Sequence, residues 1–330
     1  GDVEERGGSF PIETLNLRKT YGDKTALDNL SLRVRHNEVL GLLGPNGAGK
    51  TTAISVLTGL FPPTSGGARI SGFDIATRMS NVHQIIGVCP QFDVFHPGMT
   101  VREHLAFYAR IKGLAPEREA EVLEGALHAI GLDGRWADTD AATLSGGMKR
   151  RLTLGVSLIG NPRVLFLDEP TTGLDPETRR AVWRLIERAR VGRCVVLTTH
   201  AMDEAEALSQ RIAIMALGRL QCLGTTLHLK SKYGGGFKVD ISYDAALARA
   251  DPAAHEGIGA FVRSVLPTAR LEEDYMGTMV FVVAKADMVV SRLFRAMGSE
   301  ERPAAIEAWA LRQTSLEEVF LAIAKREERD

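Results

Sequence analysis

The sequence contains little cysteine, and its cysteines follow no pairing pattern. Cys89, Cys194 and Cys222 are the only three among 330 residues, they are widely separated, and none belongs to a Cys-x-x-Cys pair. This number and spacing argue against a disulfide framework and against a zinc site. We therefore expect buried thiols in a protein of the reducing cytosol.

Long apolar runs and an excess of either charge are also missing. No uninterrupted apolar stretch approaches the roughly 20 residues that a membrane-spanning helix needs. The formal net charge is -1, with 25% charged residues, so the composition gives no sign of nucleic-acid binding, which usually needs a basic excess. Residues 1–10 have no initiator methionine and no signal-peptide core. We interpret them as a polar linker, in a chain that was cut from a longer protein or processed.

Glycine, in contrast, is concentrated where it can bind phosphate. A glycine-rich loop joins a short apolar strand, expected at Val39–Leu43, to a helix expected at Thr51–Leu60. In loops of this pattern the backbone N–H groups face phosphate oxygens, the lysine reaches the β- and γ-phosphates, and the next hydroxyl binds Mg²⁺. The pattern also occurs in unrelated nucleotide enzymes. The residues expected to contact the nucleotide are Gly44, Pro45, Asn46, Gly47, Ala48, Gly49, Lys50, Thr51 and Thr52.

A second glycine-rich element precedes another expected helix. It reads Leu144-Ser145-Gly146-Gly147, and the N-terminus of a helix is a ready site for an anion. We therefore expect Ser145, Gly146 and Gly147 to contact phosphate as well. Two half-sites in one chain indicate that the complete site forms between two chains.

Polar side chains follow three short apolar runs, which are typical of parallel strands buried on both faces. These runs are Ile85–Cys89, Val164–Asp168 and Cys194–Thr198. Asp168 would hold the water shell of Mg²⁺, and Glu169 would orient the attacking water as a general base. Gln91 can reach Mg²⁺ or that water, and His200 can donate to a γ-phosphate oxygen. The predicted catalytic set is therefore Glu169, His200, Gln91 and Lys50.

The remaining patterns indicate two domains, at residues 11–235 and 236–330. Alternating apolar and polar residues at 13–39 predict half-buried strands, and 92–162 is expected to be a helical insertion. Residues 176–189 predict a helix that connects two parallel strands.

The glycine run at 234–236 marks the expected domain boundary. Beyond it, strands and helices follow the order β-α-β-β-α-β, which predicts a small α+β, ferredoxin-like sandwich of roughly 75 residues. A final amphipathic helix begins with the capping-box pattern Ser315-x-x-Glu318.

Three basic residues, Lys149, Arg150 and Arg151, follow the second glycine-rich element. Such a cluster could indicate a patch for phosphate or nucleic acid. We interpret it instead as the exposed face of the helix that this element opens.

Taken together, six motifs in this order and spacing resemble the nucleotide-binding domain of an ATP-binding cassette (ABC) protein. The resemblance covers roughly Ile12 to Tyr233. It implies an α/β fold of the P-loop NTPase type, with a RecA-like core, a β-subdomain and a helical subdomain, and it implies ATP and Mg²⁺ as cofactors, the metal being held by Thr51, Gln91 and Asp168. The motifs are the phosphate loop, Gln91, Leu144-Ser145-Gly146-Gly147, Asp168-Glu169, Gly173-Leu174-Asp175 and His200.

The resemblance also implies a head-to-tail dimer, in which the second glycine-rich element of one domain closes over the ATP held by the phosphate loop of the other. Asp175 would couple the two sites. Tyr21, expected in a turn between two strands, would stack on the adenine. Gln91 would lie near the contact with a membrane domain.

Finer features are similar to subfamily A of these proteins, whose members are large lipid transporters. The similar segments include Cys89-Pro90-Gln91-Phe92-Asp93, Gly146-Gly147-Met148-Lys149-Arg150 and Thr172-Gly173-Leu174-Asp175-Pro176. Domains of this subfamily carry a regulatory domain after the cassette, so residues 236–330 would be that domain. We interpret the chain as the C-terminal cassette of such a transporter.

The expected function is therefore ATP hydrolysis that powers transmembrane transport, of lipids, at the cytoplasmic face of a membrane. The expected partners are a second cassette and transmembrane domains of the same or a separate chain, with no nucleic acid. Two alternatives stay open: the ATPase subunit of a two-component, bacterial-type exporter, and a soluble ABC ATPase that has no part in transport.

Overall fold

The computed structural model describes residues 10–234, 236–246 and 251–327. It divides the chain into two compact units, the first ending at Thr225 and the second beginning at Thr226. The expected boundary lay about ten residues later. Helix α8 (Thr226–Tyr233) belongs to the second unit because it packs against the last helix, α12 (Leu316–Glu327). The expected linker falls mostly outside the described residues.

The first unit is built on a six-stranded sheet with the order β10-β9-β3-β8-β7-β6. The strands from β9 to β6 are parallel, and β10 pairs antiparallel with β9. The sequence prediction located four of these strands and missed β9 and β10. The bounds are β3 (Val39–Leu43), β6 (Ile86–Cys89), β7 (Val164–Asp168), β8 (Cys194–Thr199), β9 (Arg211–Ala216) and β10 (Arg219–Gly224).

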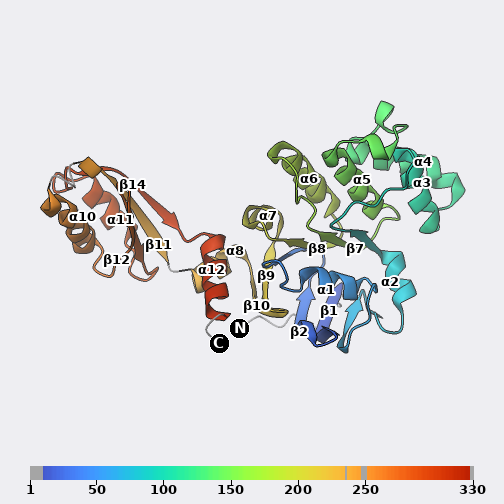
Figure 1. Ribbon diagram of the computed structural model, residues 1–330, viewed down its shortest axis with the longest axis horizontal. Coiled ribbons are helices and arrows are strands. Elements are labelled where there is room, and N and C mark those ends of the chain that lie inside the picture. The colour runs from blue at the N-terminus through green and yellow to red at the C-terminus, as the bar shows by residue number, and fades with distance from the viewer. Residues whose placement is uncertain (1–9, 235, 247–250, 328–330) are drawn as a thin grey trace. The chain divides into compact units, whose positions relative to one another are not determined.

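Both faces of this sheet are covered, which explains why its strands are apolar throughout. Alternate residues of a strand point to opposite faces. Phe166 packs in one core with α1 (Lys50–Leu57), whereas its neighbours Leu165 and Leu167 pack in another core with α6 (Pro176–Ala189). Accordingly, α1 and α6 lie on opposite sides of the sheet in Figure 1. Two further short helices flank the same sheet, α2 (Met79–Ile85) on the side of α1 and α7 (Met202–Leu208) on the side of α6.

A second, antiparallel sheet covers α1 on the side away from the central sheet. Its order is β2-β1-β4-β5, and its inner face shares a core with α1. The half-buried alternation expected at residues 13–39 is observed in this sheet. The strands are β1 (Ile12–Tyr21), β2 (Lys24–Val34), β4 (Ser65–Ile70) and β5 (Phe73–Asp74).

The helical insertion, expected at residues 92–162, contains three helices, of which the third begins at the second glycine-rich element as predicted. The chain turns at Gly113, whose φ is +75°, and Pro116 opens the next helix at a position where its missing N–H costs nothing. The helices are α3 (Val101–Ile111), α4 (Pro116–Ile130) and α5 (Gly146–Leu158).

The second unit has the expected order β-α-β-β-α-β. Its antiparallel sheet has the order β12-β13-β11-β14, and α10 and α11 pack on one face of the sheet. Glu318 accepts from the N–H of Ser315 at 3.0 Å while Ser315 Oγ accepts from the N–H of Glu318 at 3.1 Å, so the capping box before α12 is formed. The elements are β11 (Phe237–Tyr243), α10 (Pro252–Val265), β12 (Arg270–Tyr275), β13 (Thr278–Val283), α11 (Val290–Met297) and β14 (Ile306–Gln313).

Candidate nucleotide site

The register of the central sheet brings the predicted site residues to one edge. Leu43 is level with Thr199, and Thr198 is level with Asp168. Cys89 is level with Leu167 on the next strand. The carboxyl ends of β3, β8, β7 and β6 therefore meet, and the segments that follow them carry the phosphate loop and the predicted catalytic residues.

The phosphate loop has the backbone that its glycines predict. Gly47 and Gly49 have φ values of +83° and +99°, a region that side chains disfavour. A Cβ on Gly49 would also lie 2.5 Å from the carbonyl oxygen of Ala26 in β2. Glycine is thus required at residue 49, where the loop passes directly against the second sheet before α1 begins.

Lys50 is buried inside this loop. Its Nζ donates to the carbonyl oxygens of Gly44 at 2.7 Å and Pro45 at 3.1 Å, and lies 3.9 Å from Glu169 Oε1. Burial lowers the pKa of the Lys50 ammonium, although the carboxylates of Glu169 and Asp168 act in the opposite direction. The lysine is therefore a desolvated cation whose direct partners are neutral carbonyl groups.

Asp168 ends β7 beside the first turn of α1. Its Oδ1 accepts from Thr51 Oγ1 at 3.2 Å and from the hydroxyl of Thr198 on the neighbouring strand. A carboxylate and a hydroxyl in contact are the hard oxygen donors that Mg²⁺ prefers. Among the described residues no group of three His, Cys, Asp or Glu side chains could hold a metal ion. A cation here would therefore depend on this pair, on other oxygen donors such as the predicted ligand Gln91, and on oxygens of the nucleotide.

Glu169 is the residue around which the predicted catalytic set gathers. Its carboxylate is only 7% exposed. Oε2 accepts from Gln91 Nε2 at 3.3 Å and from Thr172 Oγ1 at 3.0 Å, and Oε1 lies 3.4 Å from His200 Nδ1. With Lys50 also near, three residues that are far from Glu169 in the sequence meet at its carboxylate.

The second glycine-rich element lies at the exposed start of α5. Ser145 caps the helix, its Oγ accepting from the N–H of Met148 at 3.4 Å. A Cβ on Gly147 would lie 2.3 Å from Cγ2 of Thr178, so no larger residue fits there without movement. Within the part of the chain that the structure describes, no hydrogen bond or ion pair joins this element to the phosphate loop.

Two further predicted residues lie near these elements. Asp175 caps α6, accepting from the N–H groups of Glu177 and Thr178 at 3.1 and 3.0 Å, and hydrogen bonding to Thr178 lowers its pKa. Tyr21 ends β1 with 41% of its surface exposed. Its ring meets Phe61 edge to face, with 5.7 Å between centroids, which leaves part of the ring available to a ligand.

Arg150 corrects the sequence interpretation. The cluster of three basic residues was expected to be an exposed face, but Arg150 is 4% exposed, and Lys149 and Arg151 are half-buried. The Arg150 guanidinium donates to backbone carbonyls that flank Glu169 and Gln91. Helical spacing could have predicted this burial. Leu154 and Ser157, four and seven residues after Arg150 and so on the same face of the helix, are also buried.

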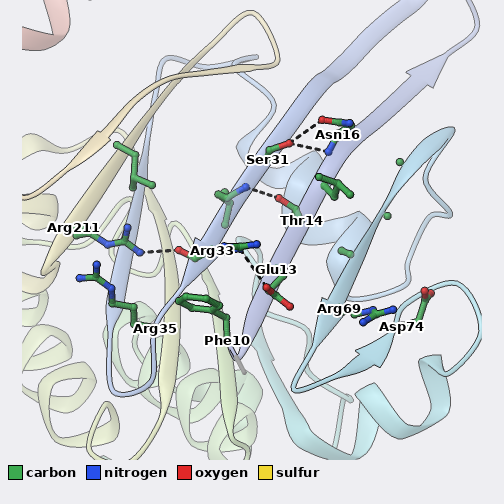
Figure 2. Close-up of a pocket in the computed structure, with 16 residues that line it drawn as sticks. Phe10, Glu13, Thr14, Asn16, Ser31, Arg33, Arg35, Arg69, Asp74 and Arg211 are labelled. Carbon is green, nitrogen blue, oxygen red and sulfur yellow. Dashed lines mark hydrogen bonds and ion pairs between the residues drawn. The ribbon is translucent and has the colours of Figure 1, made fainter. Parts of the chain in front are cut away.

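A groove of about 980 Å³ lies elsewhere on this unit, over the outer face of the second sheet. Figure 2 shows Phe10, Arg33, Arg35 and Arg211 among its lining side chains. None of the residues that line it belongs to the phosphate loop or to the set around Glu169. The groove is therefore separate from the candidate nucleotide site.

The chain resembles known proteins over most of its length. A family model described as "ABC transporter" matches residues 27–172. The chain is 41% identical over 317 residues to "ABC transporter A family member 12" of Arabidopsis thaliana, covering 94% of this chain and 34% of that protein. It is 42% identical over 304 residues to the human "Phospholipid-transporting ATPase ABCA3", covering 92% of this chain and 17% of that protein. The chain thus spans about a third or less of the length of these relatives.

Solved structures match about two thirds of the chain. An "ATP binding subunit of ABC transporter" aligns with a TM-score of 0.63 at 27% identity, covering 68% of this chain and 94% of that one. The cassette MJ0796, in a dimeric post-hydrolysis state bound to ADP and Pi, aligns with a TM-score of 0.60 at 25% identity, covering 65% and 98%. No helix in the described ranges is long and apolar enough to cross a membrane. The chain belongs to the ATP-binding cassette family, as an ABC-type ATPase domain homologous over most of its length to transporters of subfamily A.

Proposed function

We propose that the chain is the nucleotide-binding domain of a membrane transporter, and that it hydrolyses ATP to drive the transport of lipids. The observation that carries the proposal is the carboxylate of Glu169, buried at the sheet edge with Gln91, His200 and Lys50 around it. A buried carboxylate beside a phosphate-binding loop has the chemistry that a general base for water requires.

The phosphate loop and Lys50 would hold the triphosphate. Lys50 now donates to Gly44 and Pro45 carbonyls, and a β- or γ-phosphate oxygen would be a stronger acceptor for the same ammonium. Thr51 and Asp168, already in contact, would hold Mg²⁺ together with Gln91. When bound, the ion would supply charge neutralisation on the phosphate oxygens.

Hydrolysis needs a water aimed at the γ-phosphate and little other chemistry. Glu169 would accept a hydrogen bond from this water and take up its proton as the water attacks. Gln91 donates to the same carboxylate, so it can orient both the base and the water. His200, half exposed beside Glu169, would donate to a γ-phosphate oxygen.

The complete site would form between two cassettes arranged head to tail. Ser145, Gly146 and Gly147 lie at an exposed helix N-terminus, which suits the phosphates of a nucleotide on another domain. Asp175 would couple the two sites and Tyr21 would stack on the adenine. The dimeric structure of MJ0796 with ADP and Pi supports, by analogy, the pairing of two cassettes.

The membrane partner and the lipid substrate follow from similarity to longer relatives. Human ABCA3 is named a phospholipid-transporting ATPase, and we propose the same substrate class here. The chain would then lie at the cytoplasmic face of a membrane, bound to transmembrane domains of the same or a separate chain. The second unit would be the regulatory domain.

The proposal is tested by comparing ATP hydrolysis by the parent chain with that of Glu169→Gln in the presence of Mg²⁺. Loss of a general base predicts a fall in kcat of at least about a hundredfold, with nucleotide affinity retained and a dimer trapped by ATP, as seen by gel filtration. Glu187→Gln, an exposed carboxylate on α6, is the matched control and should behave as the parent. Turnover by Glu169→Gln close to the parent's would exclude Glu169 as the base.

The transport role needs a separate measurement, the size and location of the native protein. An antibody against this chain should detect a membrane-bound protein several times larger than 35.8 kDa. A band near that mass that co-purifies with a separate membrane protein would favour a two-component exporter. A band with no membrane partner would contradict the transport role and leave only the ATPase assignment.

A further inference from the structure

The side chain of Arg150 donates six hydrogen bonds near the candidate site, more than the structure gives any side chain assigned a role above. It lies on α5, roughly one and a half turns after Ser145. Its Nε donates to the carbonyl oxygen of Pro170 at 2.6 Å, and its Nη2 donates to those of Asp168 and Glu169, both at 3.0 Å. One guanidinium therefore holds three consecutive carbonyls of the segment that carries the proposed base.

The third nitrogen of the same group holds the segment after β6. Arg150 Nη1 donates to the carbonyl oxygens of Pro90 at 2.7 Å and Gln91 at 3.4 Å, and to Asp93 Oδ1 at 3.1 Å. Asp93 is itself fixed by Thr153 Oγ1 at 2.7 Å, from the next turn of α5. The guanidinium thus joins three parts of the site: helix α5, the segment that carries Glu169 and the segment that carries Gln91.

The backbone at Glu169 explains why such support is needed. Its φ is +45°, a left-handed conformation that costs a residue with a side chain about 1–2 kcal/mol. The N–H of Glu169 donates to both oxygens of Thr198, at 3.0 and 3.1 Å, and its carbonyl accepts from Arg150. Both polar groups of this strained peptide segment are therefore fixed from outside.

We propose that Arg150 is a positioning residue of the ATPase site, which holds the backbones of Glu169 and Gln91 in place and ties them to the helix whose N-terminus would meet the partner's ATP. The inference rests on the proposed function. Movement of α5 toward a second nucleotide would then shift the base and Gln91 through the same guanidinium, so that the two half-sites of one chain act together.

Lysine cannot replace this group, although it keeps the charge. The guanidinium offers five N–H donors in a planar fork, whereas the ammonium offers three from one point. The acceptors lie on two separate segments, so a lysine would leave buried carbonyls of the Glu169 segment or of the Gln91 segment without a donor. The geometry of Glu169 would loosen while the phosphate loop, which Arg150 does not contact, stays intact.

The test compares Arg150→Lys with Arg151→Lys in the full chain. Arg151 is the neighbouring arginine, and its Nη1 donates to the carbonyls of Ile130 and Gly131 at the end of α4, both at 3.1 Å. We expect Arg150→Lys to lower kcat by about ten- to a hundredfold, as misplacement of a catalytic group does, with nucleotide affinity within about threefold of the parent. Arg151→Lys should change the melting temperature without this loss of kcat.

The inference is wrong if Arg150→Lys turns over at the parent's rate, or if its loss of kcat is no larger than that of Arg151→Lys. Should Arg150→Lys not fold, Asp93→Asn weakens the contacts that Arg150 and Thr153 make on the Gln91 side and leaves those of Arg150 to the Glu169 segment. A kcat equal to the parent's would then reject the role. Hydrolysis by the parent and its loss in Glu169→Gln are measured alongside. An inactive parent would contradict the proposed function, whereas an active parent with an unaffected Arg150→Lys would contradict this inference alone.

Discussion

Each unit of the molecule buries a lysine, and the two lysines have opposite surroundings. Lys50 in the first unit donates to two backbone carbonyls, and a carboxylate oxygen lies only at 3.9 Å. Lys238 in the second unit contacts the carboxylates of Glu272 and Glu318, the latter at 2.9 Å. The first cation is poorly neutralised by its own chain, whereas the second is paired twice.

The pKa values of the two ammonium groups record this difference. Burial lowers the pKa of Lys50. Burial acts on Lys238 in the same direction, but hydrogen bonds to Glu272 and Glu318 outweigh it and raise its pKa. A buried charge that lacks a close counter-charge is a feature of functional sites, whereas a fully paired one is usual in structural networks. The comparison therefore supports the proposal that Lys50 binds a ligand, and it indicates that Lys238 contributes to stability.

Among the changes that test this comparison, the largest effect is expected from Lys50→Ala, on the affinity for ATP. Removing the ammonium should lower the affinity for ATP by about ten- to a hundredfold, because a charge-assisted contact to phosphate is lost. The melting temperature should change little, since the lysine has no close counter-ion in the folded chain. Titration with a fluorescent nucleotide and a thermal melt measure the two quantities. Unchanged affinity would mean that the loop is not the nucleotide site.

Lys238→Ala should show the reverse pattern. Two carboxylates would lose their partner, which we expect to destabilise the second unit by about 1–2 kcal/mol, less than for a fully buried pair because Glu272 is half exposed to water. Hydrogen exchange of the β11 amides measures this loss, with the exposed Lys232→Ala as control. ATP affinity should equal the parent's, and a lower affinity would break the proposed division of roles.

The smallest effect is expected for the pH dependence of stability that Glu318 of the second unit contributes. Burial would raise the pKa of Glu318, but hydrogen bonds from Lys238, Arg312 and Ser315 lower it below 4.5. A lowered pKa stabilises the fold above pH 4.5, and this contribution is lost as the pH falls through the folded value. Glu318→Gln, which keeps the capping box, should reduce stability by up to about 1 kcal/mol at pH 7. The difference in melting temperature should narrow below pH 4.5, and a constant difference would contradict the charge-based account.

The sequence was a good guide to the site wherever function is carried by residues at strand ends. Glu169, Gln91 and His200 follow apolar runs, and parallel strands bring their carboxyl ends to one sheet edge, so their meeting could be predicted from spacing. The assignment of roles also depended on family resemblance. The structure adds how closely the side chains meet.

The sequence predictions differ from the structure where tertiary packing determines whether a residue is buried or to which unit a helix belongs. Arg150 looks like a surface residue in a basic cluster, and only the buried positions that share its helix face point inward. Helix α8 precedes a glycine run that looks like a boundary, yet its packing against α12 places it with the second unit. In both cases the local pattern correctly indicated a polar residue or a turn. It carried no information on the residues, distant in the sequence, against which the segment packs.

The positive φ of Glu169 has a consequence for selection. Glycine or asparagine adopts this backbone more readily than glutamate does, so either residue would relieve strain at the cost of the proposed base. A search for heat-resistant variants that did not also demand turnover would therefore enrich chains that lack the proposed base at this one position. Stability and activity are opposed there by the shape of a single peptide segment.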